Sequence, residues 1–257
     1  MEKLVEELVR IQEEGASGVL ATVVEAEKGA AVAAGQKYLV RDGKPVVGTI
    51  RHERLLEAIV NEAEVRLKEE KSKLVSLELP GTDDKIEVFF EVLPAPPILI
   101  VVGAGHIAVP LAKFAKLLDF HVTVLDDRIL FANRERFPDA DEVQVGDMAA
   151  ALKALPIAAS TYIVLITRGH KYDEPCLREI IHSRAKYIGM IGSRRRIKAL
   201  FEKFRNEEKI AEEILQRVYA PIGLDIATET PEEIALSIMA EIVKVRRGGE
   251  ARSLSGK

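Results

Sequence analysis

The sequence predicts an α/β protein, with a C-terminal Rossmann-like parallel sheet that has helices on both faces and a smaller N-terminal α+β domain. Three observations lead to this prediction. An aliphatic run, Ile98 to Val102, leads directly into a glycine turn and a helical pattern. Strand and helix patterns then alternate toward the C-terminus. A proline-rich segment, Pro94 to Pro97, separates this part from an N-terminal segment with a different pattern.

Residues 1–93 have the pattern of an α+β domain. An acidic amphipathic helix ends at Gly15, and a longer amphipathic helix spans Glu53 to Glu70. The other runs are rich in strand-forming residues, and they are Val19 to Glu25, Lys37 to Arg41, Pro45 to Ile50, Leu74 to Leu77 and Ile86 to Val92. This segment shows no recognisable catalytic cluster. Prolines then disfavour both helix and strand, so we place the domain boundary between residues 93 and 98.

Residues 98–127 predict a strand, a turn, a helix and a second strand. The unbroken aliphatic run suits a parallel strand that is buried on both faces. The turn is Gly103-Ala104-Gly105, and apolar residues recur at helical spacing from Ile107. Such a turn brings backbone N–H groups at a helix N-terminus close to a phosphate. Asp126 follows about 20 residues later, where a carboxylate accepts hydrogen bonds from a ribose or another diol.

The remaining sequence continues the alternation. The predicted strands are Glu142 to Val145, Tyr162 to Thr167 and Tyr187 to Ile191. The predicted helices are Asp147 to Leu155, Glu174 to Ser183, a helix from the arginines after Ser193 through Phe204, Asn206 to Arg217, and a last helix that begins with a capping box at Thr230 and runs to about Arg246.

Polar residues gather where the predicted parallel strands end, which is where ligands bind in open α/β sheets. We therefore expect one crevice there. Its candidate cofactor-binding residues are Gly103, Gly105, His106, Asp126, Arg128, His170, Ser193 and Arg194. Ser193 and the arginines after it open a helix, where a hydroxyl, amides and guanidinium groups suit a phosphate.

Several of these residues have a structural interpretation as well. His106 is either a ligand contact or a polar residue on the helix surface. His170 with Asp173 either orients an imidazole for acid–base chemistry or forms a loop salt pair. Cys176 opens a predicted helix, where a thiol pKa can fall, but such a cysteine is more often part of the core. Too few metal-type ligands converge for a protein-built metal site, so we expect none.

Composition limits the class of protein. The 257 residues are 47% hydrophobic and 30% charged, with a formal net charge of -4, which does not indicate nucleic acid or an anionic membrane as a partner. No apolar run reaches the length of a membrane span, and the N-terminus is an acidic amphipathic helix pattern rather than a signal peptide. We therefore expect a cytoplasmic protein. Its single cysteine excludes internal disulfides.

The chain after Pro97 resembles the xanthine dehydrogenase accessory protein family. The resemblance is carried by five motifs together, GAGHIA, VTVLDDR, FANRERFPDAD, YIGMIGSRRR and PIGLDIATETPEEIALSIMAEI. It implies a chaperone that binds the molybdenum cofactor, a pterin, and protects it while a cysteine desulfurase-type donor supplies sulfur. The implied client is a molybdenum hydroxylase of the xanthine dehydrogenase type, and the implied assembly is a homodimer. The resemblance therefore favours an accessory protein without catalytic residues of its own.

The N-terminal half resembles the family more loosely. Where the family has a run of glycines before the helix, this chain has Gly48-Thr49-Ile50-Arg51-His52. Glycines that allow close backbone approach are thus replaced by Arg51 and His52. Two alternatives to the chaperone stay open from the residues alone. One is an NAD(P)-dependent oxidoreductase that uses the same glycine turn, and the other is a non-catalytic interaction module that kept the fold.

Overall fold

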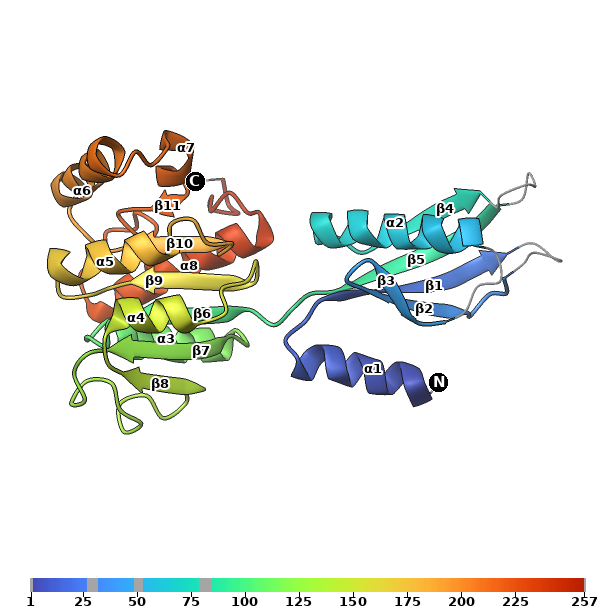
Figure 1. The fold of residues 1–257 in the computed structure, drawn as a ribbon, viewed down its shortest axis with the longest axis horizontal. Coiled ribbons are helices and arrows are strands. Elements are labelled where there is room, and N and C mark those ends of the chain that lie inside the picture. Colours follow the sequence, from blue (N-terminus) through green and yellow to red (C-terminus); the bar gives the residue numbers. More distant parts are fainter. Residues whose placement is uncertain (1, 27–31, 49–52, 79–84, 257) are drawn as a thin grey trace. The chain divides into compact units, whose positions relative to one another are not determined.

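The structure is a computed structural model that describes residues 2–26, 32–48, 53–78 and 85–256 (Figure 1). The chain divides into two compact units, Met1–Pro96 and Pro97–Lys257. In the ranges just given, no helix combines the length and the apolar character that crossing a membrane requires.

Unit 1 is a five-stranded antiparallel sheet with two helices. Along the sheet the strand order is β3-β2-β1-β5-β4. The elements in chain order are α1 (Glu2–Glu13), β1 (Gly18–Ala26), β2 (Lys37–Arg41), β3 (Lys44–Val47), α2 (Glu53–Glu69), β4 (Lys73–Glu78) and β5 (Lys85–Leu93). Within this unit α1 and α2 lie on opposite faces of the sheet (Figure 1).

The alternation of side chains along β1 explains why both faces are covered. Val19 and Ala21 point to the face covered by α2 and pack in one cluster with Ile59. Leu20, between them, points to the other face and packs in a second cluster with Ile11 of α1. Because successive strand residues point to opposite faces, one apolar strand supplies two small cores.

Unit 2 is a six-stranded parallel sheet with the order β11-β10-β9-β6-β7-β8. The strands are β6 (Ile98–Val102), β7 (His121–Asp126), β8 (Glu142–Val145), β9 (Thr161–Leu165), β10 (Tyr187–Met190) and β11 (Val218–Tyr219). The register aligns Val102 with Leu125 on one side and with Leu165 on the other. The carboxyl ends of the three central strands are therefore level with one another.

Helices cover both faces of this sheet, which confirms the predicted Rossmann-like architecture. The helices are α3 (Ala108–Leu117), α4 (Met148–Ala154), α5 (His170–Ile180), α6 (Arg194–Glu207), α7 (Glu212–Leu215) and α8 (Pro231–Arg247). Leu99 and Val101 of β6 pack with α3 and α8, whereas Ile100 and Val102 pack with the helices of the other face. Both faces of β6 are buried, as its unbroken aliphatic run predicts.

Two helix predictions were wrong in their bounds. The helix predicted from Glu174 begins four residues earlier at His170, because amides of its first turn already donate to Gly169 O, so Pro175 lies inside the helix. The helix predicted over Asn206 to Arg217 is the end of α6 followed by the single turn α7. The chain then forms β11, a two-residue edge strand that is too short to show a strand pattern.

Some predictions lie outside the described residues. Among them are Arg51 and His52, which the resemblance places where the family has glycines, and the loop expected at residues 80–84 between the predicted strands Leu74 to Leu77 and Ile86 to Val92. The thiol of Cys176 is described, and it is buried in the core between the sheet and α5. Burial and nearby carboxylates raise its pKa to about 12, so the thiol stays protonated and unreactive near neutral pH.

We expect limited proteolysis to cut near Pro94–Pro97, since an extended segment between two separately packed cores is accessible to a protease. Mass spectrometry should find a resistant fragment that begins near Ile98, and circular dichroism should show that this fragment folds alone. A chain that resists cleavage until it is wholly unfolded would contradict the prediction.

Candidate functional site

The glycine turn after β6 begins with a residue that only glycine can fill. Gly103 has a φ of 104°, and its N–H donates to Leu125 O at 2.7 Å. A Cβ on Gly103 would lie 2.5 Å from Ile166 O, which is closer than carbon and oxygen atoms approach. The missing side chain thus allows the turn to pass between the ends of β7 and β9.

Asp126 holds this turn from the end of β7. The residue is buried, with 2% exposure, and its Oδ2 accepts from Ala104 N at 2.7 Å. The same carboxylate accepts from Arg128 N at 3.0 Å, from Arg128 Nε at 2.8 Å and from Arg128 Nη2 at 2.9 Å. Four donors therefore occupy both oxygens. Asp126 thus anchors its own loop through Arg128 in this structure.

The hydrogen bonds also decide the charge of Asp126. Burial alone would raise its pKa, but the bonds from the Arg128 side chain, from Ala104 N and from Arg128 N outweigh burial and lower the pKa to about 2. The carboxylate is thus ionised throughout the physiological range. Its negative charge is compensated by the guanidinium of Arg128, which leaves little net charge at this point of the sheet edge.

Gly105 and His106 lie on the open side of the turn. A Cβ built on Gly105 would meet no heavy atom within 4 Å, and its φ lies outside the left-handed region, so the position tolerates a side chain as far as the protein itself is concerned. His106 is exposed in the two residues before α3. Helix α3 begins directly afterwards, and its first amides have no intrahelical partners. Pro110 lies in this first turn, where its missing N–H costs nothing.

The loop between β7 and β8 supplies a residue that the sequence did not single out. Arg136 Nη1 donates to Ala104 O at 2.7 Å and to Phe131 O at 2.9 Å, and its Nη2 lies 3.5 Å from Gly105 O. Arg136 belongs to the FANRERFPDAD motif, which contributed to the family resemblance without a role. Nothing in the sequence marks which arginine of this motif reaches back about 30 residues to the turn.

A second polar network lies at the ends of β9 and β10. Asp173 of α5 is buried and accepts from Thr167 Oγ1 and, at 2.9 Å, from Arg196 Nη2. Arg168 Nη2 donates to both carboxylate oxygens of Asp127, at 2.6 and 2.7 Å, which connects the loop after β9 with the end of β7. The predicted partner of Asp173, the imidazole of His170, is a side chain outside the described part of the chain.

The side chains of the three consecutive arginines point in different directions, as expected for successive residues of a helix. Ser193 is the N-cap of α6 and accepts from Arg196 N at 3.4 Å. Arg196 turns inward to Asp173, whereas Arg194 and Arg195 are exposed. Within the residues that the structure describes, neither of these two side chains makes a hydrogen bond or an ion pair. Arg194 and Arg195 are therefore two exposed cations at this sheet edge that have no anionic partner among the described residues.

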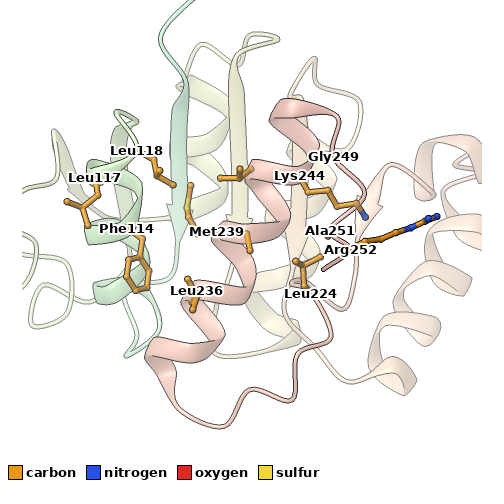
Figure 2. A pocket seen from close by; sticks show the side chains of 12 residues that line it. Phe114, Leu117, Leu118, Leu224, Leu236, Met239, Lys244, Gly249, Ala251 and Arg252 are labelled. Carbon is orange, nitrogen blue, oxygen red and sulfur yellow. The ribbon is translucent and has the colours of Figure 1, made fainter. Parts of the chain in front are cut away.

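An apolar groove lies elsewhere on unit 2, between α3 and α8 (Figure 2). Its volume is about 580 Å³, and its walls include Phe114, Leu117, Leu236 and Met239. None of the candidate cofactor-binding residues lines it. The candidate site is thus the polar edge of the sheet and not the apolar groove. In the described ranges no cluster of three or more His, Cys, Asp or Glu residues is arranged to hold a metal ion.

Asp126→Asn should lower the free energy of unfolding by about 2–3 kcal/mol at pH 7. A neutral amide then replaces the buried carboxylate and leaves the guanidinium of Arg128 without its ionic partner. The folded pKa is below the unfolded value, so this contribution is present above about pH 4 and is lost as the pH falls toward 2. Urea unfolding of wild type and variant should therefore converge at low pH. Asp139→Asn, an exposed change in the next loop, serves as the control; equal losses in both variants would contradict the assignment.

Comparison with known proteins identifies the family. The XdhC Rossmann domain model matches residues 99–242, and the XdhC and CoxI family model matches residues 11–78. The chain is 29% identical over 250 residues to the uncharacterized protein YqeB of Escherichia coli, a match that covers 93% of this chain and 46% of YqeB. It is 31% identical over 172 residues to a probable xanthine dehydrogenase subunit of Bacillus subtilis, covering 67% of this chain and 50% of that protein.

The chain spans about half the length of these curated relatives. A crystal structure described as a xanthine dehydrogenase from Bacillus halodurans superimposes with a TM-score of 0.55 at 21% identity, covering 98% of both chains, and this likeness shows a shared fold. The first family model alone accounts for more than half of the residues, including the glycine turn, Asp126, the Arg136 loop and the start of α6. The chain belongs to the XdhC family.

Proposed function

We propose that this protein binds the phosphate-bearing pterin of the molybdenum cofactor as its cargo and delivers it to a molybdenum hydroxylase of the xanthine dehydrogenase type. The observation that carries the proposal is the geometry of the glycine turn. Hydrogen bonds to Asp126 and Arg136 fix its backbone, and no protein atom lies within 4 Å of where a Cβ on Gly105 would be. Membership of the XdhC family and the name of the Bacillus subtilis relative, which describes a probable subunit of xanthine dehydrogenase, support this choice of cargo and client.

The groups at the sheet edge suit a phosphate. The open turn and the first amides of α3 offer N–H donors to an anion, and the missing Cβ of Gly105 lets the anion approach the backbone. Arg194 adds an exposed positive charge after β10, the strand that β9 separates from β6, and Ser193 adds a hydroxyl. His106, exposed beside the turn, is a further candidate contact.

The same edge offers little to a nicotinamide dinucleotide. In dinucleotide-binding folds a carboxylate at the end of the second strand accepts from the ribose. Here both oxygens of Asp126 are already engaged by Arg128 and Ala104. A hydride-transfer enzyme also needs a group that moves the substrate proton, and His170 is the candidate in the sequence for that role. The occupied carboxylate of Asp126 favours a binding protein over an NAD(P)-dependent oxidoreductase.

The cysteine content supports a separate sulfur donor. Cys176 is the single cysteine of the chain, and burial raises the pKa of its thiol far above neutral. A buried, protonated thiol does not carry a persulfide to a bound cofactor. We therefore propose that the sulfur comes from a cysteine desulfurase-type partner while the pterin stays bound to this protein. A homodimer, as the family resemblance implies, is part of the same proposal.

Calorimetric titration should detect tight binding of the pterin molybdenum cofactor and weak or no binding of NAD and NADP. The physical reason is that the turn and Arg194 serve a phosphate, whereas Asp126 has no free oxygen for a ribose. The loaded protein should then activate an apo molybdenum hydroxylase, measured as its recovered turnover. Tight dinucleotide binding with substrate-dependent reduction of that dinucleotide would replace the chaperone proposal with the oxidoreductase.

Gly105→Val should abolish cofactor binding with little change in melting temperature, because the new side chain enters space that only the ligand uses. Arg194→Ala should weaken binding about tenfold through the loss of one charge. Gly249→Val is the matched control, since a Cβ there also meets no heavy atom within 4 Å but the residue lies beyond α8. Calorimetry and thermal melts check all three. Wild-type affinity in both Gly105→Val and Arg194→Ala would remove these residues from the site.

A further inference from the structure

We propose that Arg136 is the positioning residue of the phosphate-binding turn, which it orients by holding two consecutive carbonyl groups away from the ligand. The proposal rests on the proposed function, because it concerns the same turn. It adds the group that turns the amides of Gly105 and His106 outward, and it gives a role to the FANRERFPDAD motif. Arg136 itself does not contact the ligand in this arrangement.

Peptide geometry links the carbonyls to the amides. In a trans peptide group the C=O of one residue and the N–H of the next point in opposite directions. Arg136 Nη1 holds Ala104 O at 2.7 Å, and its Nη2 lies 3.5 Å from Gly105 O. The N–H groups of Gly105 and His106 belong to those two peptide groups. They must therefore point away from Arg136, which lies behind the turn.

The remaining peptide groups of the turn are fixed as well. Gly103 N donates to Leu125 O at 2.7 Å, and Ala104 N donates to Asp126 Oδ2 at 2.7 Å. Together with the two carbonyls held by Arg136, this makes four consecutive peptide groups with a set orientation. Arg136 holds the two peptide groups whose N–H groups, those of Gly105 and His106, face the open side of the turn.

The guanidinium of Arg136 is itself held in place. It donates to Phe131 O at 2.9 Å and lies 5.0 Å from the centre of the Phe131 ring. Arg128 stacks on the same ring at 3.7 Å and is bound to Asp126. A closed chain of contacts thus runs from the turn through Asp126, Arg128, Phe131 and Arg136 back to the turn. A residue fixed by so many neighbours can set the orientation of a backbone that contains glycine.

Without Arg136 the two peptide groups would lose their anchor. Glycine has access to more backbone conformations than any other residue, so the peptides on either side of Gly105 are the ones most easily rotated. A rotated peptide group presents its carbonyl oxygen, a partial negative charge, where the phosphate should bind. The positive charge of Arg136 also polarises the two peptide groups and strengthens their N–H donors. Both effects raise the affinity of the turn for an anion.

The test compares the full-length variants Arg136→Ala and Arg136→Lys with Arg134→Ala as the matched control. Arg134 lies in the same loop and also donates to backbone carbonyls, those of Ala140 and Asp141, but it does not reach the turn. Nuclear magnetic resonance would first record the amide signals and hydrogen exchange of Gly105 and His106 without ligand. Titration with inorganic phosphate would then follow the same two signals.

Arg136→Ala should shift and broaden the two amide signals before any ligand is added, and it should weaken phosphate binding at least tenfold. Arg136→Lys should recover part of the affinity, and Arg134→Ala should leave signals and affinity unchanged. Unchanged amide signals and phosphate affinity in Arg136→Ala would overturn the inference and leave the proposed function standing. Absence of phosphate-induced shifts in the wild type would overturn the proposed phosphate binding, and the role of Arg136 in it, whatever the ligand-free signals show. If Arg136→Ala fails to fold, Arg136→Gln replaces it in both measurements.

Discussion

The buried carboxylate of Asp126 is the interaction on which the sheet edge of unit 2 depends. It takes one hydrogen bond from the glycine turn and three from Arg128, so it joins the end of β7 to the turn that follows β6. A buried charge is tolerated only when it is paired and hydrogen-bonded, and this one is fully satisfied. Arg128 lies at the start of the loop that contains Phe131 and Arg136. Arg128 stacks on the ring of Phe131, and Arg136 donates to the carbonyl groups of Phe131 and Ala104.

The parallel sheet adds a second constraint, the close approach of neighbouring strand ends. The register places the residues after Val102, Leu125 and Leu165 side by side, and the turn at Gly103 passes so near Ile166 O that no side chain fits there. The polar side chains of this edge then pair among themselves across strands, as in the pairs Asp127–Arg168 and Asp173–Arg196. The groups left for a ligand among the described residues include backbone amides, the exposed His106 and the two exposed arginines of α6.

That distribution of free and occupied groups supports the proposed role in binding a phosphate-bearing cargo. Acid–base catalysis needs a titratable group held near a reacting atom, and the carboxylates described at this edge are engaged in holding the scaffold. A phosphate, by contrast, needs only oriented N–H donors and positive charge. The apolar groove between α3 and α8 is not part of this site, because none of the polar residues at the sheet edge lines its walls (Figure 2).

The sequence by itself determined the fold class and the elements with strong local signals. The aliphatic run at Ile98 to Val102, the glycine turn and the capping box at Thr230 all have short-range causes, and the structure contains each of them. Sequence also led to the candidate crevice, because strand ends in a parallel sheet must meet. Only the tertiary structure decided that Asp126 faces inward to Arg128 and Ala104, that Arg136 reaches the turn, and that α7 and β11 follow α6. These outcomes depend on contacts between residues that are distant in the chain or on elements of two to four residues, and neither leaves a periodic pattern in the sequence.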